Sequence, residues 1–140
     1  MKKLFYISIS LIIVSFVIGP TTLYSQEEIA ATDEAKRVLE QYFYSMKNGN
    51  TSQILNLITG PLLKKRERLL KYNTQYGNFL RERYKNANLF ITSMGFTHNN
   101  KLSLKASIVF DDQQKLDLIF TFSEEGSDGN LKIYSKEKIP

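Results

Sequence analysis

The spacing of the apolar residues changes once along the chain, close to Asn88. Before this point apolar residues recur every three or four positions, which is typical of one face of a helix. After it they alternate with polar residues, which is typical of one face of a strand. Because the helical pattern comes first and the strand pattern second, the sequence predicts an α+β domain.

The first predicted helix begins at an N-cap in Thr32 or Asp33 and ends near Lys47. Its apolar stripe consists of Ala35, Val38, Leu39, Tyr42, Phe43 and Met46. Gly49, which is free to adopt the left-handed conformation, terminates it. Residues 26–31 are short and polar, and we expect them to form a flexible lead.

Three more helices are predicted before the strands. Thr51 is the expected cap of a short second helix that Gly60 ends, and Pro61 suits the first turn of a third. The fourth is predicted from Thr74 to Asn86. The apolar residues of the second helix are Ile54, Leu55, Leu57 and Ile58, and those of the fourth are Tyr76, Phe79, Leu80 and Tyr84. Each helix therefore has an apolar side to bury.

The alternating segments are "LFITSMGFT", "KLSLKASIVFD", "KLDLIFTFS" and "LKIYS", joined by short polar connections. One face of the second and third segments carries Leu102, Leu104, Ala106, Ile108 and Phe110, and Leu116, Leu118, Phe120 and Phe122. This pattern predicts an antiparallel sheet of about four strands with one covered face and one wetter face. Val109 and Ile119 lie among polar residues on the wetter face, which would suit a homodimer formed through the sheet.

The N-terminus has the parts of a secretory signal peptide in their usual order. Lys2 and Lys3 precede an apolar stretch from Leu4 to Gly19, and Ser25 before Gln26 is a suitable cleavage point. The stretch is shorter than the roughly 20 apolar residues of a spanning helix. With no cysteine, the chain can form neither a disulfide nor a lipid-anchored lipoprotein. We therefore expect residues 1–25 to be a signal peptide, and the protein to be bacterial and either periplasmic or secreted.

Charge and composition argue against several kinds of site. Removal of Lys2 and Lys3 takes the formal charge from +5 to +3, too small an excess for a nucleic-acid-binding protein. The single histidine, His98, falls in a predicted turn, and no cluster of His, Cys, Asp or Glu has the spacing of a metal site. We therefore predict no metal, no cofactor and no nucleic-acid partner.

The segment 32–138 resembles the nuclear transport factor 2-like (cystatin-like) superfamily. The residues that carry the resemblance are Val38, Tyr42, Phe43, the "KNGN" turn, Ile54 to Leu57 and the closing strand "LKIYS". Leu131 stands where members commonly have a tryptophan, and Asn50 where they have an acid. The resemblance implies helices on one face of a curved sheet, which forms a cone-shaped roll with a pocket at its mouth. Members include isomerases, polyketide cyclases, dehydratases and non-enzymatic binding or dimerisation domains, so membership leaves the function open.

The third predicted helix, "PLLKKRERLLK", contains an arginine in an unexpected place. On a helical wheel its four leucines form one arc, and Lys64, Lys65, Arg68 and Lys71 form a basic surface outside that arc. Arg66 falls near the middle of the leucine arc, and Arg83 repeats this exception in the next helix. A buried guanidinium must reach water, pair with an acid or face a pocket.

These residues lead to three hypotheses. The first is a non-catalytic binding domain that holds a small anionic or peptidic ligand at the pocket mouth through Arg66, Arg83, Tyr42 and Tyr84. The second is an enzyme of the polyketide cyclase or isomerase type that uses Tyr42 or Tyr84 with Arg66. The third is a module whose basic helices, residues 61–85, contact an anionic membrane surface or an acidic protein. We expect the first hypothesis to hold. Tyr42 and Tyr84 are the only polar groups that clearly face inward, and a buried tyrosine is more often a core residue than a catalytic one.

Overall fold

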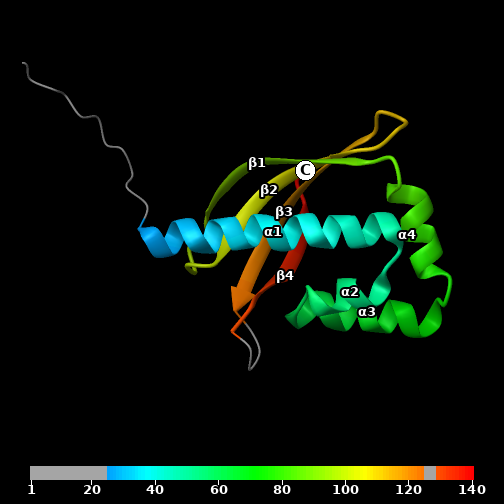
Figure 1. Ribbon diagram of the computed structural model, residues 1–140, viewed down its shortest axis with the longest axis horizontal. Coiled ribbons are helices and arrows are strands. Elements are labelled where there is room, and N and C mark those ends of the chain that lie inside the picture. The colour runs from blue at the N-terminus through cyan, green and yellow to red at the C-terminus, as the bar shows by residue number, and fades with distance from the viewer. Residues whose placement is uncertain (1–24, 125–128) are drawn as a thin grey trace, which may run out of the picture.

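The computed structural model describes residues 25–124 and 129–140 (Figure 1). Within these ranges four helices precede four strands. They are α1 (Gln26–Asn48), α2 (Thr51–Asn56), α3 (Gly60–Tyr72), α4 (Tyr76–Tyr84), β1 (Asn88–Phe96), β2 (Leu102–Val109), β3 (Lys115–Glu124) and β4 (Leu131–Lys138). This order confirms the predicted α+β fold. The predicted signal peptide lies, except for Ser25, outside the described residues.

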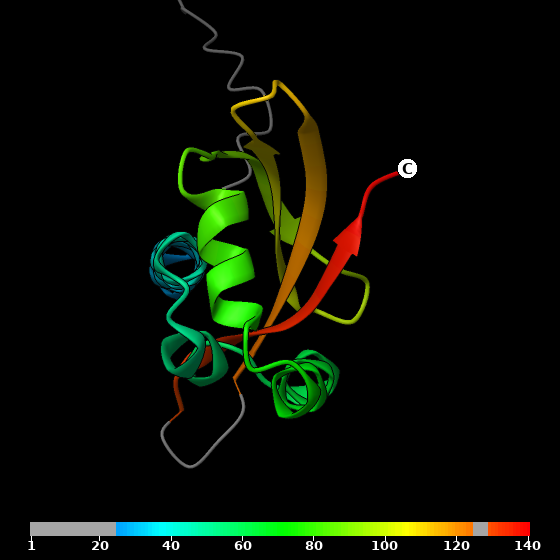
Figure 2. The same cartoon turned by 90° about the vertical axis from the view of Figure 1, so that its right-hand side faces the viewer.

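The four strands form one antiparallel sheet in the order β1-β2-β3-β4, so that β1 and β4 are its edges. The sheet is curved and the helices lie on one side of it, with α1 along its length (Figures 1 and 2). The pairing of β3 with β4 is interrupted by an irregularity between Thr121 and Phe122. This irregularity decides which side chains of β4 face the helices.

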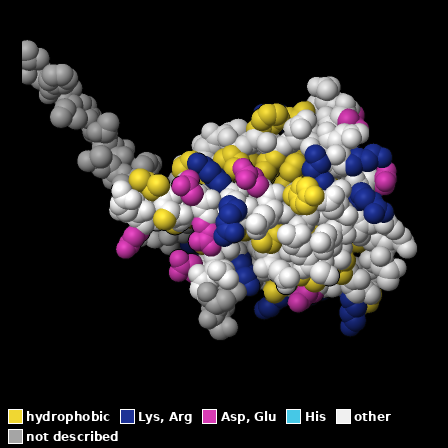
Figure 3. Space-filling view, viewed as in Figure 1, with side chains coloured by type: hydrophobic (Ala, Val, Ile, Leu, Met, Phe, Trp, Pro, Cys, Tyr) yellow, Lys and Arg dark blue, Asp and Glu magenta, His cyan; other side chains and the backbone are white. Residues whose placement is uncertain are grey.

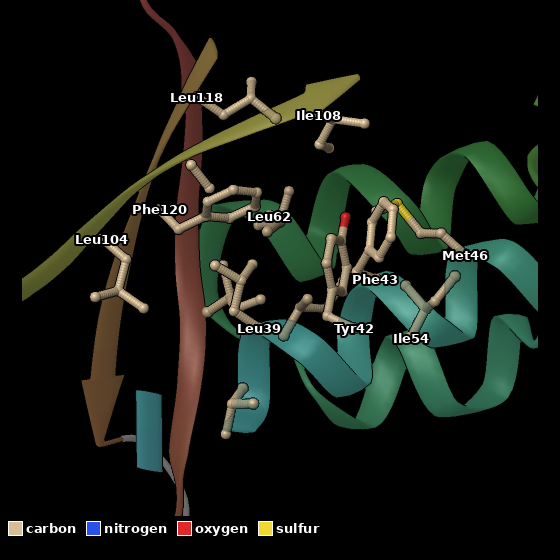
Figure 4. Packing of buried hydrophobic residues seen from close by; sticks show 14 of the residues in the cluster. Leu39, Tyr42, Phe43, Met46, Ile54, Leu62, Leu104, Ile108, Leu118 and Phe120 are labelled. Atoms are coloured by element: carbon tan, nitrogen blue, oxygen red, sulfur yellow. The ribbon is translucent and has the colours of Figure 1, made fainter. Parts of the chain in front are cut away.

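The main core lies between α1 and the covered face of the sheet, as Figure 4 shows. Tyr42 of α1 is completely buried and meets Phe120 of β3 edge-on, with ring centres 6.3 Å apart. The predicted inward faces of the two central strands are confirmed, because their apolar residues are buried or partly buried. Burial of each large apolar side chain contributes about 1.5–3 kcal/mol to stability, and this layer fixes the position of α1.

α1 begins earlier than the sequence predicted. Ser25 is its N-cap: the Ser25 hydroxyl accepts a hydrogen bond from the Glu28 backbone N–H (3.2 Å), and the Glu28 carboxylate accepts one from the Ser25 N–H (2.8 Å). This reciprocal capping box satisfies two backbone donors that the first helical turn leaves free. The predicted start at Thr32 or Asp33 is therefore wrong, and residues 26–31 form helix rather than a flexible lead.

The end of α1 is confirmed, and it brings α1 close to α4. Gly49 has a φ of 65°, the left-handed conformation predicted for it. A Cβ on Gly49 would lie 2.3 Å from the Gly77 carbonyl oxygen of α4. The cap of α2 was predicted one residue late, because the side chain of Asn50 rather than Thr51 accepts the backbone N–H of Gln53.

α4 is shorter than predicted and buries a narrower stripe. Tyr76, Leu80 and Tyr84, which are four residues apart, are buried. Phe79 was assigned to the same apolar side, but its side chain is 59% exposed. It stacks on the Tyr76 ring, with centroids 6.0 Å apart. Phe79 thus lies at the edge of a cavity rather than in the core.

Candidate functional site

A cavity of about 650 Å³ lies between α3, α4 and the strands β3 and β4. Figure 2 looks at the side of the molecule where these elements meet. The cationic residues that line it are Lys65, Arg66, Arg83, Lys115, Lys136 and Lys138. The large apolar and aromatic residues that line it include Leu62, Leu69, Tyr76, Phe79, Leu80, Tyr84, Phe110 and Leu116. No aspartate or glutamate is among its described lining residues, although Asp112 pairs with Arg83 (3.7 Å) and Asp117 with Lys115 (3.1 Å) from outside the lining. The cavity therefore combines apolar walls with an excess of positive charge.

Arg66 is placed in this cavity by the geometry of α3. Leu62 and Arg66 are one helical turn apart and are both buried, because this side of α3 faces β4. Arg66 is only 9% exposed. Its Nη2 donates a hydrogen bond to the Tyr42 hydroxyl (3.0 Å), and its guanidinium carbon lies 5.3 Å from the centre of the Tyr76 ring. The predicted position of Arg66 on the leucine side is confirmed.

The partners of Arg66 decide between the explanations offered for a buried arginine. Within residues 25–124 and 129–140 it forms no ion pair with an aspartate or glutamate. Its low exposure also means that it does not extend into bulk water. Its hydrogen-bond partner is a neutral phenol. Arg66 therefore faces the cavity as a buried cation whose charge no described carboxylate neutralises.

The two predicted tyrosines differ in their relation to the cavity. Tyr42 is buried behind Arg66 and holds the guanidinium by its hydroxyl. Tyr84 lines the cavity itself, between Phe43 and Phe110. Burial raises the pKa of Tyr84, with a further contribution from Tyr42, while Arg66 and Arg83 oppose the increase. Tyr84 is therefore a protonated phenol that can donate a hydrogen bond to a ligand.

Arg83 also lines this cavity, but it is exposed at the rim and in a different state from Arg66. Its guanidinium carbon lies 4.0 Å from the centre of the Phe110 ring, and its Nη2 donates to the Gln114 side chain (3.0 Å). Its Nη1 is 3.7 Å from the Asp112 carboxylate. The side chain is 39% exposed. Arg83 is thus partly neutralised and hydrated, whereas Arg66 is neither.

Lys136 is the site residue that the sequence did not reveal. Across the irregularity, Ile133 pairs with Phe122 and Ser135 with Thr121, so Tyr134 is an extra residue in β4. The next pair joins Lys136 to Phe120, whose side chain faces the helices. Simple alternation from Leu131 and Ile133 would have turned Ser135 and Glu137 inward instead. The bulge therefore directs Lys136 into the cavity.

The surroundings of Lys136 are unfavourable for its charge. Burial, together with the positive charges of Arg66 and Lys65, lowers the pKa of its amine to about 8. These causes show that Lys136 and Arg66 lie close enough to repel each other. An anion placed between them would be attracted by both.

The basic surface of α3 is confirmed as a solvated face. Lys64, Lys65, Arg68 and Lys71 are all exposed, and Lys65 also reaches the cavity rim. Tyr72, at the end of α3, is 79% exposed, and the Lys71 amine lies 5.7 Å from its ring centre. This surface is therefore separate from the buried Arg66, although both belong to one helix.

The remaining surfaces give less evidence of a binding site. Figure 3 shows apolar side chains on the face of the molecule that it views. The exposed large apolar residues of α1 and β1 include Ile29, Tyr44, Met94 and Phe96. On the outer sheet face Asp117 accepts a hydrogen bond from Ser107, and the homodimer expected there stays a prediction. His98 is exposed in its turn, and the described residues contain no cluster suited to a metal ion. Among these residues no helix is long and apolar enough to cross a bilayer.

No protein-family model, curated protein or solved structure matches this sequence. Membership of the nuclear transport factor 2-like superfamily therefore stays a prediction. The function has to be argued from the cavity.

Proposed function

We propose that the protein is an exported, non-catalytic binding domain that holds a small anionic ligand in the cavity between α3, α4 and the sheet. One observation carries this proposal: Arg66 is buried against the cavity with a neutral hydrogen-bond partner and no ion-pair partner among the described residues. The export half of the proposal rests on the signal-peptide pattern of residues 1–25.

The energetic argument concerns the cost of burying charge. Removal of a guanidinium or ammonium group from water costs several kcal/mol unless an opposite charge compensates it. Arg66 and Lys136 share one cavity, so each makes burial of the other less favourable. A bound carboxylate, phosphate or sulfate would compensate both, and the planar guanidinium can donate two parallel hydrogen bonds to such a group.

The lining supports binding rather than catalysis. Proton transfer at neutral pH needs a base whose pKa lies near 7. The described lining contains neither histidine nor carboxylate, and the raised pKa of Tyr84 keeps its phenol protonated at neutral pH. Lys136, with a pKa of about 8, is the lining group that comes nearest to such a base, and an anion bound beside it would keep its amine charged. Rim cations such as Lys65 and Lys138 can raise the local concentration of an anion without reacting with it.

The test is calorimetric titration of the purified protein with acetate, phosphate and sulfate. We expect binding that Arg66→Met weakens at least tenfold and that Arg68→Met leaves within about twofold, because Arg68 is exposed on the same helix and does not line the cavity. Equal effects of the two substitutions would contradict the proposal, since the cavity would then contribute no more than surface charge.

A second candidate function uses the basic surface of α3. It is favoured by one observation: Tyr72 is highly exposed beside Lys71, Arg68 and Lys64, an arrangement suited to an anionic lipid interface. Sedimentation with vesicles of phosphatidylglycerol tests it. Such binding should weaken steadily as salt rises and should depend on Lys64, Arg68 and Lys71 but not on Arg66.

A further inference from the structure

The positive charges of the cavity are arranged by depth. Arg66 is buried next to the Tyr42 hydroxyl. Lys136 is partly buried opposite Phe120 and close to Arg66, so both cations belong to the inner end of the cavity. Lys65, Lys115 and Lys138 are exposed at the rim. An anionic group that reached the inner end would meet two cations from two different elements, α3 and β4. The strongest anion site is therefore at the bottom of the cavity and not at its mouth.

The walls between bottom and mouth are apolar. Leu62, Leu80, Tyr84 and Phe110 are buried and line the cavity. Leu69 and Leu116 continue this wall as partly buried residues, and Phe79 extends it to the solvent. An inorganic anion would touch almost none of these side chains. A cavity of 650 Å³ falls within the range of about 300–1,000 Å³ that binds organic molecules.

We propose that the ligand is an amphipathic anion with one acidic head and an unbranched or aromatic apolar body, such as a medium-chain carboxylate, bound head-first. The head contacts Arg66 and Lys136, and the body runs along Phe110 and Leu80 and leaves the cavity beside Phe79. This deepens the proposed function and rests on it, because it names the class of anion and its orientation.

The orientation explains two otherwise unrelated features. Phe79 is an exposed aromatic residue on a helix whose other large apolar residues are buried, and a ligand body at the mouth would cover it. A ligand body packed against the apolar walls would exclude water around the inner cations, which would strengthen their attraction for a single acidic head. The reverse orientation would bury the apolar end against the charges of Arg66 and Lys136.

The experiment is a calorimetric titration series with acetate, hexanoate, octanoate and decanoate, together with decyl phosphate, 1-decanol and inorganic phosphate. Each ligand is kept below its micelle concentration. We expect affinity to increase by up to about fourfold per methylene group, the value for transfer of a methylene from water to an apolar site. The increase should become smaller once the chain extends past Phe79. 1-Decanol should bind at least tenfold more weakly than decanoate.

Three variants distinguish the contacts made by the acidic head of the ligand from those made by its apolar body. Arg66→Met should weaken the binding of acetate and of decanoate by the same factor, because both have the same head. Lys136→Met should have the same effect, and it replaces Arg66→Met in the series if that variant folds poorly. Phe79→Ser should weaken decanoate several-fold and leave acetate unchanged, since Phe79 is exposed and its replacement leaves the core intact. Arg81→Met is the control, because Arg81 is exposed on α4 and does not line the cavity.

The outcomes distinguish the two proposals. If acetate, phosphate and decanoate bind equally well and all depend on Arg66, the cavity holds a small anion and the amphipathic ligand is refuted, while the proposed function stands. If 1-decanol binds as tightly as decanoate, the acidic head is not recognised and the amphipathic anion is refuted. If no anion depends on Arg66 or Lys136, both proposals fail. If Phe79→Ser weakens acetate as much as decanoate, the head-first orientation is wrong.

Discussion

The hydrogen bond between Arg66 and Tyr42 provides the sharpest test of whether the arginine is present for stability or for a ligand. We consider Arg66→Leu and Tyr42→Phe, singly and together. If Arg66 serves a ligand, the double variant without ligand should be more stable than the natural protein. The reason is that the double variant replaces a buried charge and its polar partner with apolar groups, which is often stabilising for buried charged groups in other proteins.

The magnitudes follow from the burial of the two side chains. Tyr42→Phe removes the acceptor of Arg66 Nη2 and should cost about 1–3 kcal/mol, the penalty for an unsatisfied buried donor. Arg66→Leu removes a buried cation but leaves the Tyr42 hydroxyl without its partner, so the two effects should largely cancel. The double variant leaves neither group, and we expect it to gain about 1–4 kcal/mol. The coupling free energy between Arg66 and Tyr42, obtained from this double-mutant cycle, is then large and easily measured.

Urea unfolding followed by circular dichroism measures all four free energies. Tyrosine fluorescence is a second probe, because the chain has eight tyrosines and no tryptophan. With an m-value of about 1–3 kcal/mol per molar urea, a change of 2 kcal/mol moves the midpoint by roughly 1 M. Loss of several kcal/mol in Arg66→Leu, with no recovery in the double variant, would refute the reasoning. Arg66 would then be a structural residue, and the anion-binding proposal would lose its main support.

Three further predictions can be tested on the same protein. The pKa of Lys136 is about 8 in the folded protein instead of the usual 10.5, because of burial and of the charges of Arg66 and Lys65. Between pH 8 and pH 10.5 the unfolded chain therefore binds more protons than the folded protein. Stability should therefore rise with pH from about 8 to 10.5, and urea midpoints of Lys136→Met should lack this rise. Anion binding near pH 8 should take up protons as Lys136 becomes charged, which titration in buffers of different ionisation enthalpy would detect. Gly49→Ala should cost about 2 kcal/mol or more, measured as a lower thermal midpoint, because of its positive φ and its contact with Gly77.

Much of the fold could be predicted because each element follows one strong local rule. The apolar period of α1 is unbroken from Ala35 to Met46, and Gly49 ends it with the conformation that glycine favours. The position of Arg66 could be predicted for the same reason, since a regular helix fixes the direction of every side chain. A residue that breaks a regular pattern is recognisable only where the pattern itself is regular.

The errors arose where two local rules competed. The start of α1 was placed too late because Thr32 and Asp33 are good caps, while Ser25 and Glu28 form a capping box that spans the predicted cleavage point between Ser25 and Gln26. Phe79 fits the apolar period of α4, but only one narrow side of that helix is covered. The width of the covered side depends on tertiary packing and cannot be derived from the sequence of α4.

Arg66 and Lys136 reach the cavity by different physical routes, and this strengthens the functional argument. Arg66 occupies an apolar position of a regular helix, whereas Lys136 is turned inward by an extra residue in β4. Either exception alone could be a tolerated irregularity of a stable fold. Local rules are broken most often at functional sites, where stability is sacrificed to another requirement. Two independent exceptions that place the same sign of charge in one apolar cavity are difficult to explain by stability, because each makes the other more costly, and a bound anion relieves both.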